Sequence, residues 1–237
     1  MNGQHNEYSY IGSELQLFAN ATKWRAYWSS FVIPFLGENV LEVGAGIGTL
    51  TNLHARRARE WLALEPDPVL ALKLSESLDS ITTQHVTTQV GEIHAVDPNL
   101  RFSSIIYADV LEHIEADEAE LKKAAERLLP GGFLIVMAPA HNSIYSEFDR
   151  SVGHFRRYSA KDIPRLNPLN ADLVLTQYLD SAGLLASTAN RFLLHSDMPS
   201  ERQIAFWDNK LIPLSQAFDR LLKFKLGKSI LIVWKHR

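Results

Sequence analysis

Residues 38–51 read ENVLEVGAGIGTLT, a short apolar run that leads into three glycines and a polar stretch. The run, with Val40, Leu41 and Val43, is as long and as apolar as a buried strand. The glycines free the backbone to turn sharply and to lie close to a ligand. Glu42 interrupts the apolar run, and its burial costs free energy unless the carboxylate has a polar partner. The stretch therefore predicts a strand, a ligand-binding turn and the start of a helix.

The spacing of the glycines separates two classes of nucleotide-binding protein. The dinucleotide fingerprint is G-x-G-x-x-G/A, whose amides and following helix receive a pyrophosphate. In this chain the third glycine, Gly48, comes one position early, and Thr49 stands where the fingerprint has Gly or Ala. The next apolar run ends at Glu65, at about the interval expected for a carboxylate that binds ribose hydroxyls. A nucleoside without a pyrophosphate is therefore favoured, and an NAD-binding oxidoreductase is the weaker alternative.

Apolar runs alternate with helical patterns along the chain, which is typical of a parallel sheet covered by helices. A helix is expected from Asp117 to Leu129, ended by the Pro130-Gly131-Gly132 sequence, and another from Lys210 to Phe224. The expected strands are residues 40–43, 61–65, 86–90, 102–108, 133–139, 171–179 and 229–235.

The composition limits the partners of the chain. A net charge of -3 gives no overall attraction to nucleic acid or to an anionic membrane. No run approaches the ~20 apolar residues that span a bilayer. The absence of cysteine excludes disulfides and thiolate metal sites. We therefore expect a cytoplasmic protein, a monomer or a homodimer, with a small-molecule partner and no nucleic-acid or membrane partner.

Four motifs in the right order give the chain a family resemblance. They are LEVGAGIGTLT (41–51), LALEPDP (62–68), YADVLEHI (107–114) and LLPGGFLIVMAPA (128–140). With them the chain resembles the class I S-adenosylmethionine (SAM)-dependent methyltransferases. The resemblance implies an α/β, Rossmann-like three-layer sandwich with a seven-stranded sheet of order 3-2-1-4-5-7-6 and strand 7 antiparallel. It also implies SAM as the cofactor and S-adenosylhomocysteine as the product.

We expect a single methyltransferase domain over residues 1–237. Residues 1–37, which include the aromatic Tyr8, Tyr10, Trp24 and Tyr27, read as a helical lid or an added layer on the sheet. The other expected parts are a SAM-binding core over 38–140, an acceptor-side insertion over 141–170 and the remainder of the sheet over 171–237.

The cofactor is expected outside the carboxyl ends of the strands, near the point where the strand order reverses. By the resemblance, Glu42 and the glycine turn border the methionine part, and Glu65 accepts from the ribose hydroxyls. Glu92 and Ile93 approach the adenine, and Asp109 lies at the methionine end; the alternative for Asp109 is a helix cap. The predicted cofactor-binding residues are Glu42, Gly44, Ala45, Gly46, Gly48, Glu65, Pro66, Glu92, Ile93 and Asp109.

Two histidines are candidates for a general base, which methyl transfer needs when the nucleophile carries a proton. His113 follows the fourth expected strand in the LEH sequence, and His141 follows the fifth. The alternatives are a site-wall residue for His113 and a polar loop residue for His141. If neither acts as a base, positioning of the reactants alone accounts for catalysis.

The segment GHFRRY (153–158) places an imidazole, two guanidinium groups and a phenol close together. Arginine binds carboxylate or phosphate through two parallel hydrogen bonds, so an anionic acceptor is one interpretation. The alternative is that the arginines pair with Glu147, Asp149 or Asp162 and close the loop. The segment resembles an element of a bacterial subgroup of these methyltransferases. The predicted substrate-binding residues are His154, Arg156, Arg157 and Tyr158.

Other site types are not favoured by the sequence. Histidines do not recur at the i, i+4 spacing of a helical zinc site, so no metal is expected. There is no Walker lysine and no Gly-x-Ser-x-Gly turn. The sequence therefore predicts a SAM-dependent methyltransferase that moves a methyl group to oxygen or nitrogen of a small, possibly anionic acceptor. A non-catalytic SAM-binding protein is the alternative.

Overall fold

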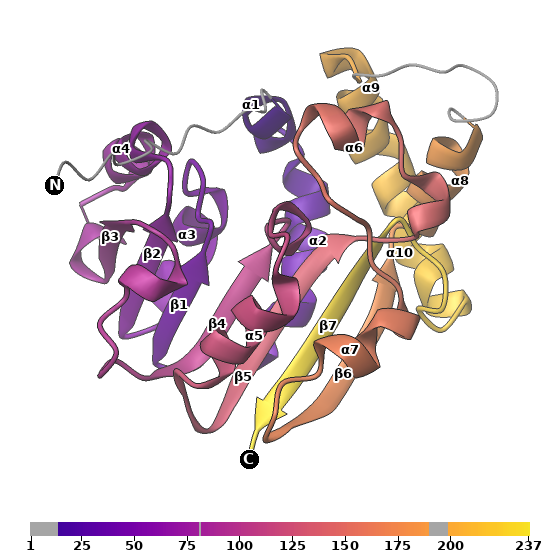
Figure 1. Cartoon of the computed structure of the whole chain (residues 1–237). Helices are drawn as coiled ribbons and strands as arrows, with labels where there is room; N and C mark the ends of the chain where they lie inside the picture. Colours follow the sequence, from indigo (N-terminus) through magenta and orange to yellow (C-terminus); the bar gives the residue numbers. More distant parts are fainter. Residues whose placement is uncertain (1–13, 81, 190–198) are drawn as a thin grey trace, which may run out of the picture.

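The computed structural model describes residues 14–80, 82–189 and 199–237, so Tyr8 and Tyr10 lie outside the described residues. Helices and strands alternate through most of the chain (Figure 1). The strands are β1 (Asn39–Val43), β2 (Glu60–Glu65), β3 (Val86–Val90), β4 (Phe102–Ala108), β5 (Leu128–Pro139), β6 (Ala171–Leu179) and β7 (Ser229–His236). The helices are α1 (Glu14–Ala19), α2 (Thr22–Val32), α3 (Thr49–His54), α4 (Pro68–Ser77), α5 (Asp117–Ala125), α6 (Glu147–Ser151), α7 (Ile163–Leu166), α8 (Ser181–Ala189), α9 (Glu201–Phe206) and α10 (Ile212–Leu221).

All seven strands form one sheet of order β3-β2-β1-β4-β5-β7-β6. The pairs from β3 to β5 are parallel, and β7 runs antiparallel to both β5 and β6. This arrangement confirms the expected strand order. The order reverses at β1, which pairs with β2 on one side and with β4 on the other. A ligand site is therefore expected at the carboxyl ends of β1 and β4.

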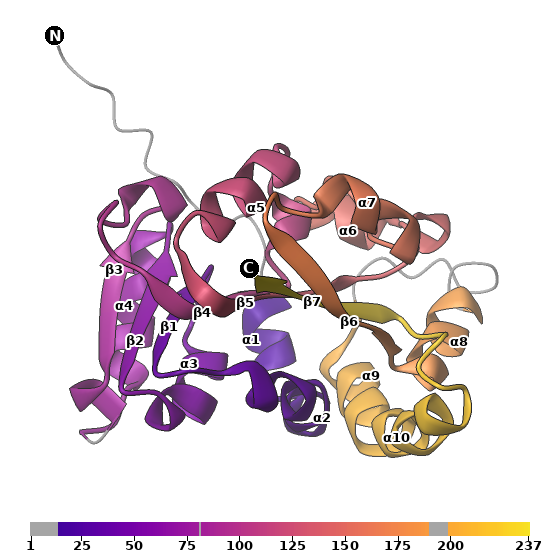
Figure 2. The same ribbon diagram turned by 90° about the horizontal axis from the view of Figure 1, so that it is seen from below.

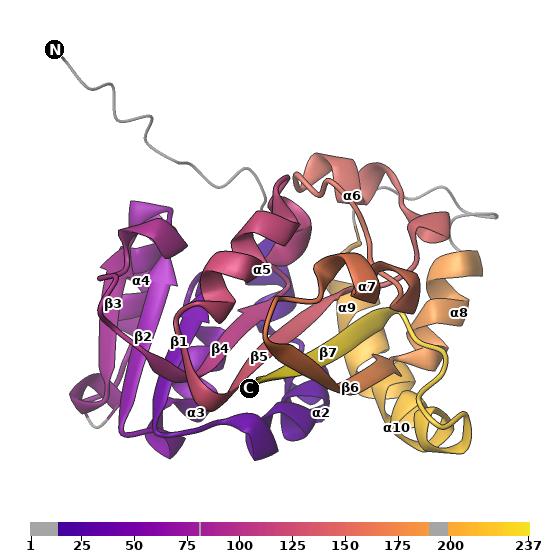
Figure 3. The ribbon, with the colours of Figure 1, turned by 60° about the horizontal axis from the view of Figure 1, so that its bottom comes forward.

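Helices cover both faces of the sheet, which gives three layers (Figures 2 and 3). Side chains of α5 and α7 pack in one buried cluster with the side chains of one sheet face, such as Leu41 and Ile105. Side chains of α2, α3, α4 and α10 pack in a second cluster on the opposite face, around Trp61 and Ile106. Both faces of the sheet are thus buried, which explains why its central strands read as continuous apolar runs.

Two helix ends differ from the sequence expectation. The helix expected to reach Leu129 ends at Ala125, because Leu128 already pairs with Phe102 at the start of β5. The Pro-Gly-Gly sequence therefore lies inside a strand and does not end the helix. The helix expected from Lys210 begins with a π-helical turn over Trp207–Leu211 and continues as α10 only to Leu221.

The N-terminal helices are fixed above the carboxyl ends of the parallel strands, where Figure 1 shows α1 beside α6. The carboxylate of Asp208 accepts hydrogen bonds from the backbone amides of Lys23 (3.2 Å) and Trp24 (2.8 Å) at the start of α2. The Tyr27 hydroxyl donates to Asp219 of α10 at 2.9 Å. These contacts join α2 to the last helical segments of the chain, and Leu15 of the preceding α1 lies over Gly46 of the glycine turn.

Candidate functional site

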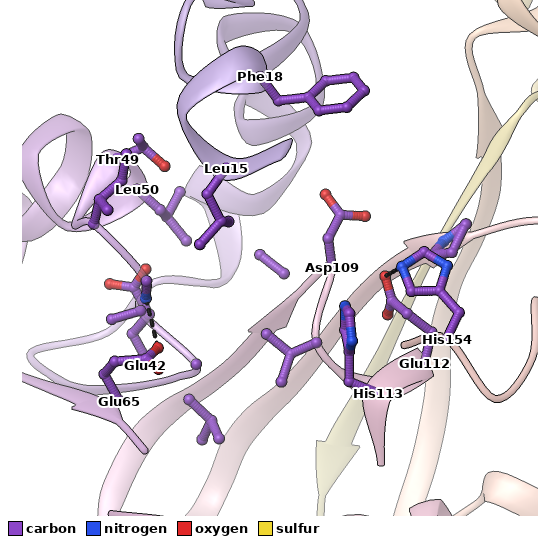
Figure 4. Close-up of a pocket in the computed structure, with 18 of the residues that line it drawn as sticks. Leu15, Phe18, Glu42, Thr49, Leu50, Glu65, Asp109, Glu112, His113 and His154 are labelled. Carbon is purple, nitrogen blue, oxygen red and sulfur yellow. Dashed lines mark hydrogen bonds and ion pairs between the residues drawn. The ribbon is translucent and has the colours of Figure 1, made fainter. Parts of the chain in front are cut away.

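A cavity of about 520 Å³ lies between α1, α2 and the carboxyl ends of β1, β2 and β4. Its size is that of a typical small-molecule site. Figure 4 shows Glu42 and Glu65 on one side, Glu112, His113 and His154 on the other, and Asp109 between them, with Leu15 and Phe18 above. Of the predicted cofactor-binding residues, Glu42, Gly44, Ala45, Gly46, Glu65, Pro66, Glu92 and Asp109 line the cavity.

The three glycines of the turn have different surroundings, so each lacks a side chain for a different structural reason. Gly44 (φ 68°) passes so close to Val110 that an added Cβ would lie 2.5 Å from it. Gly46 (φ 57°) also lines the cavity, where an added Cβ would meet only Leu15, at 3.8 Å. Gly48 (φ 81°) is not among the lining residues; its Cα faces Leu74 of α4. The lack of a side chain at Gly48 therefore allows α4 to pack closely against the turn. The structure does not support the predicted contact of Gly48 with the cofactor.

Glu65 ends β2 with its carboxylate at the cavity wall. Its Oε2 atom accepts from the Gly46 amide at 2.8 Å and its Oε1 atom from the Asp67 amide at 3.0 Å. Burial raises the pKa of Glu65, and these two backbone hydrogen bonds oppose that rise. A carboxylate oxygen can accept more than one hydrogen bond, so the fixed carboxylate retains capacity for ligand hydroxyls.

Glu42 has the polar partners that its place in an apolar strand requires. Its Oε2 atom accepts from the Thr51 hydroxyl at 2.6 Å and from the Trp61 indole at 2.8 Å. Burial raises the pKa of Glu42 to about 7 despite these hydrogen bonds.

Asp109 follows β4 in a left-handed conformation (φ 54°), which directs its side chain into the cavity (Figure 4). Loss of hydration raises the pKa of Asp109 to about 6, and the charges of His154 and Lys228 oppose that rise. Glu92 lines the cavity, whereas Ile93 is buried in the core and is not a lining residue. The structure therefore does not support the prediction that Ile93 binds the cofactor.

The structure brings Glu112, His113 and His154 together. Glu112 and His113 belong to the helical turn Leu111–His113 after β4, and His154 follows α6. The rings of the two histidines meet edge to face with centroids 4.6 Å apart, and His154 Nε2 lies 3.9 Å from Glu112 Oε1. Burial and the charge of His154 lower the pKa of His113 to about 4, and burial raises the pKa of Glu112 well above its usual range.

The two arginines of the GHFRRY segment are engaged by the protein itself. Arg157 donates to both carboxylate oxygens of Asp149, at 2.8 and 2.9 Å. Arg156 pairs with Asp117 at 2.6 Å and donates to the Glu115 carbonyl at 2.8 Å. Arg157 lines the cavity and Arg156 does not. The alternative interpretation, an ion pair within the loop, holds for Arg157, whereas the partner of Arg156 is Asp117, which that interpretation did not name.

Tyr158 and His141 are not lining residues either. The Tyr158 hydroxyl is buried, 2.9 Å from the Leu111 carbonyl oxygen and 3.1 Å from Asp117 Oδ2, so the structure does not place it at the cavity. The His141 ring stacks on Tyr178, and its Nε2 atom lies 3.0 Å from the Gly227 carbonyl oxygen. A turn with φ 65° at His141 directs the ring away from the acceptor space in which the sequence placed it.

Several lining residues were missed from the sequence. Arg25 of α2 lines the cavity and donates to the Ala19 carbonyl at 2.6 Å, and Phe148 of α6 and Lys228 before β7 close the opposite side. These residues lie far apart in the chain and belong to no motif. Only the packing of the first and last helices on the sheet brings them together. The Glu112, His113 and His154 cluster was missed for the same reason, because His154 belongs to a segment distant in the chain from the other two residues.

A family model described as "Methyltransferase domain" matches residues 13–184. The chain belongs to the class I SAM-dependent methyltransferases. A solved SAM-dependent methyltransferase from Mesorhizobium loti is similar in fold, with a TM-score of 0.62 at 12% identity over 93% of this chain and 100% of that one. The N-methyltransferase NodS from Bradyrhizobium japonicum WM9, solved with S-adenosylhomocysteine, gives 0.60 at 14% identity over 95% and 93%.

Two sequence relatives match only part of this methyltransferase. The ubiquinone biosynthesis O-methyltransferase of Bradyrhizobium diazoefficiens is 29% identical over 102 residues, which are 42% of this chain and 39% of that protein. A probable ribosomal RNA small subunit methyltransferase A of Methanosarcina acetivorans is 38% identical over only 60 residues, 22% of its length. The matched parts thus span well under half of these relatives.

In residues 14–80, 82–189 and 199–237, no helix combines the length and apolarity that a membrane crossing requires.

Proposed function

We propose that this methyltransferase transfers the methyl group of SAM to an oxygen or nitrogen atom of a small molecule. The observation that carries the proposal is the cavity at the reversal of strand order, with the glycine turn and Glu65 on one side and polar side chains on the other. The similarity to a ubiquinone biosynthesis O-methyltransferase supports oxygen as an acceptor atom.

The lining residues fit SAM at the glycine turn. Glu65 would accept hydrogen bonds from the ribose hydroxyls, because its carboxylate is fixed by two backbone amides. Pro66 and Glu92 would border the adenosine, and Gly44, Gly46 and Asp109 the methionine part. Bound SAM supplies an electrophilic methyl group on a sulfonium. The protein's part is alignment and exclusion of water, to which Leu15 and Phe18 contribute from above the cavity.

The acceptor would lie on the side of His113, His154 and Phe148. Arg157, which lines the cavity, is paired with Asp149, and Arg156 lies outside the cavity lining. This pairing favours an uncharged acceptor over the anionic one that the arginines of the sequence motif suggested. Of the two candidate bases, only His113 lines the cavity, and its low pKa makes it a weak base at neutral pH.

Titration calorimetry with S-adenosylhomocysteine and NAD tests the donor. We expect binding of the first and none of the second. Transfer of labelled methyl from SAM to a panel of phenols, alcohols and amines then tests the reaction. Binding of NAD alone, or tight S-adenosylhomocysteine binding without transfer to any of the panel, would count against the proposal.

A Glu65→Gln substitution is expected to weaken S-adenosylhomocysteine binding by about 10- to 100-fold. Hydrogen bonds to a charged acceptor contribute about 1.5–3 kcal/mol, and the amide retains one acceptor oxygen where the carboxylate has two. The matched control is Glu60→Gln, at the exposed opposite end of the same strand. Calorimetry measures both affinities; equal affinities for the two variants would remove Glu65 from the cofactor site.

A further inference from the structure

The Glu112, His113 and His154 cluster has the composition of a metal site. One ligand atom from each side chain, two imidazole nitrogens and one carboxylate oxygen, can be chosen so that all three lie within 4.8 Å of one another. Two histidines with one glutamate is a known zinc ligand set, in which the metal keeps an open position. Donors around a tetrahedral ion are about 3.4 Å apart for bonds near 2.1 Å, so side-chain rotations that close the cluster by about an ångström would complete the geometry.

The hydrogen bonding of the cluster leaves a place for a cation. The Oε2 atom of Glu112 is buried without a hydrogen-bond partner in the described residues, and the residue is only 1% exposed. His154 Nδ1 lies 2.9 Å from Asp149 Oδ1, and a carboxylate there fixes the proton on Nδ1. The other ring nitrogen then directs a lone pair toward Glu112 Oε1, 3.9 Å away. Two electron-rich atoms that face each other in a buried place are stabilised by a proton or by a metal cation between them.

Neighbouring residues hold the proposed ligand side chains in place through hydrogen bonds, as the residues around the ligands do in metal sites. Arg157 and His154 both bind Asp149, so the carboxylate that orients His154 is itself fixed. The Phe155 amide donates to the Glu112 carbonyl at 2.8 Å, which joins the two segments of the cluster directly. A carboxylate on the far nitrogen of a ligating histidine is the usual support in such sites. The GHFRRY segment thus contains one ligand, His154, and residues that position it.

We propose that Glu112, His113 and His154 bind a divalent transition-metal cation such as Zn²⁺, with an open coordination position toward the cavity. Imidazole nitrogens favour such a cation over Mg²⁺ or Ca²⁺. If the proposed function holds, the open position faces the acceptor side and selects acceptors with an oxygen or nitrogen that can coordinate the metal. His113 is then a ligand, and its nitrogen does not act as a general base.

The test uses the full chain, dialysed against zinc chloride and then against metal-free buffer, with bound zinc measured by mass spectrometry. We expect about one equivalent per chain, and titration with Co²⁺ is expected to give the visible absorption of a four- or five-coordinate site. Glu112→Gln and His154→Ala are expected to lower zinc affinity at least ~100-fold. Asp149→Asn is expected to lower it by about 10- to 100-fold through the orientation of His154.

His94→Ala is the matched control, because His94 and Glu92 form an exposed histidine and glutamate pair at 3.4 Å. We expect it to retain zinc. Circular dichroism checks that each variant is folded. Less than ~0.1 equivalent of zinc on the native chain, or unchanged affinity in folded Glu112→Gln, overturns the site. S-adenosylhomocysteine binding is measured on the same samples. Absence of zinc from a native chain that binds the cofactor refutes the metal site alone, and zinc on a native chain that does not bind the cofactor refutes the proposed function alone.

Discussion

A Gly46→Val substitution is expected to reduce S-adenosylhomocysteine affinity at least ~100-fold. Gly46 adopts a left-handed conformation (φ 57°) that is strained for a β-branched residue. Its Cα faces the cavity toward Leu15, so a valine side chain would enter the space of the ligand. Any shift of the turn would also displace the Gly46 amide from Glu65. Calorimetry with S-adenosylhomocysteine measures the loss.

Gly131→Val separates this effect from backbone strain alone. Gly131 also has a positive φ (78°), and an added Cβ there would meet only Lys235, at 3.9 Å. It lies near the start of β5, away from the cavity. Both variants should lose about 1–2 kcal/mol of stability to strain, but only Gly46→Val should lose the ligand. Unchanged ligand affinity in folded Gly46→Val would place the cofactor elsewhere.

The sheet and the cavity wall formed by the glycine turn and Glu65 could be predicted because they depend on short-range patterns. Each buried strand is visible in the sequence as a continuous apolar run. The glycine turn and Glu65 directly follow such runs. The order of the strands came from the family resemblance. The predicted end of α5 was wrong because proline and glycine residues within a strand give the same local signal as residues that end a helix.

The acceptor side could not be predicted because it depends on contacts between distant segments. The sequence left open whether the arginines pair with Asp149 and gave no sign of Asp117, which pairs with Arg156 only in the fold. His141 follows a strand that ends at the cavity, but one residue in a left-handed conformation turns its side chain away. Such outcomes follow from packing, which spacing along the chain does not encode.

Asp149→Ala is expected to destabilise the protein by about 3–5 kcal/mol. Asp149 is fully buried and accepts two hydrogen bonds from Arg157, which is itself only 6% exposed. Its removal leaves a buried guanidinium without a counter-charge, which is the costly way to break an ion pair. The loss also removes the cap of α6, since the Ser146 amide donates to Asp149 at 2.8 Å. Denaturant unfolding followed by circular dichroism measures the change.

Asp162→Ala provides a closely matched control. Asp162 caps a second short helical turn through Ser159 in the same way, and it too has an arginine partner, Arg165, but at 3.9 Å and partly exposed. We expect this variant to lose only about 1 kcal/mol, the contribution of a cap and a weak surface pair. Similar losses in the two variants would show that capping, and not the buried ion pair, accounts for the stability.

The pH dependence of the Asp149 contribution has a definite sign. Burial alone would raise the pKa of Asp149, but hydrogen bonds from His154 and Arg157 outweigh it and hold the pKa well below its usual value near 3.9. A carboxylate whose pKa is lower in the folded state stabilises the fold above the unfolded-state pKa and loses that contribution as the pH falls toward the folded-state value. The difference in unfolding free energy between native protein and Asp149→Ala should therefore be constant from about pH 5 to 7 and shrink below about pH 4. A difference that instead shrank as the pH rose from 5 to 7 would mean that another group titrates in this ion pair.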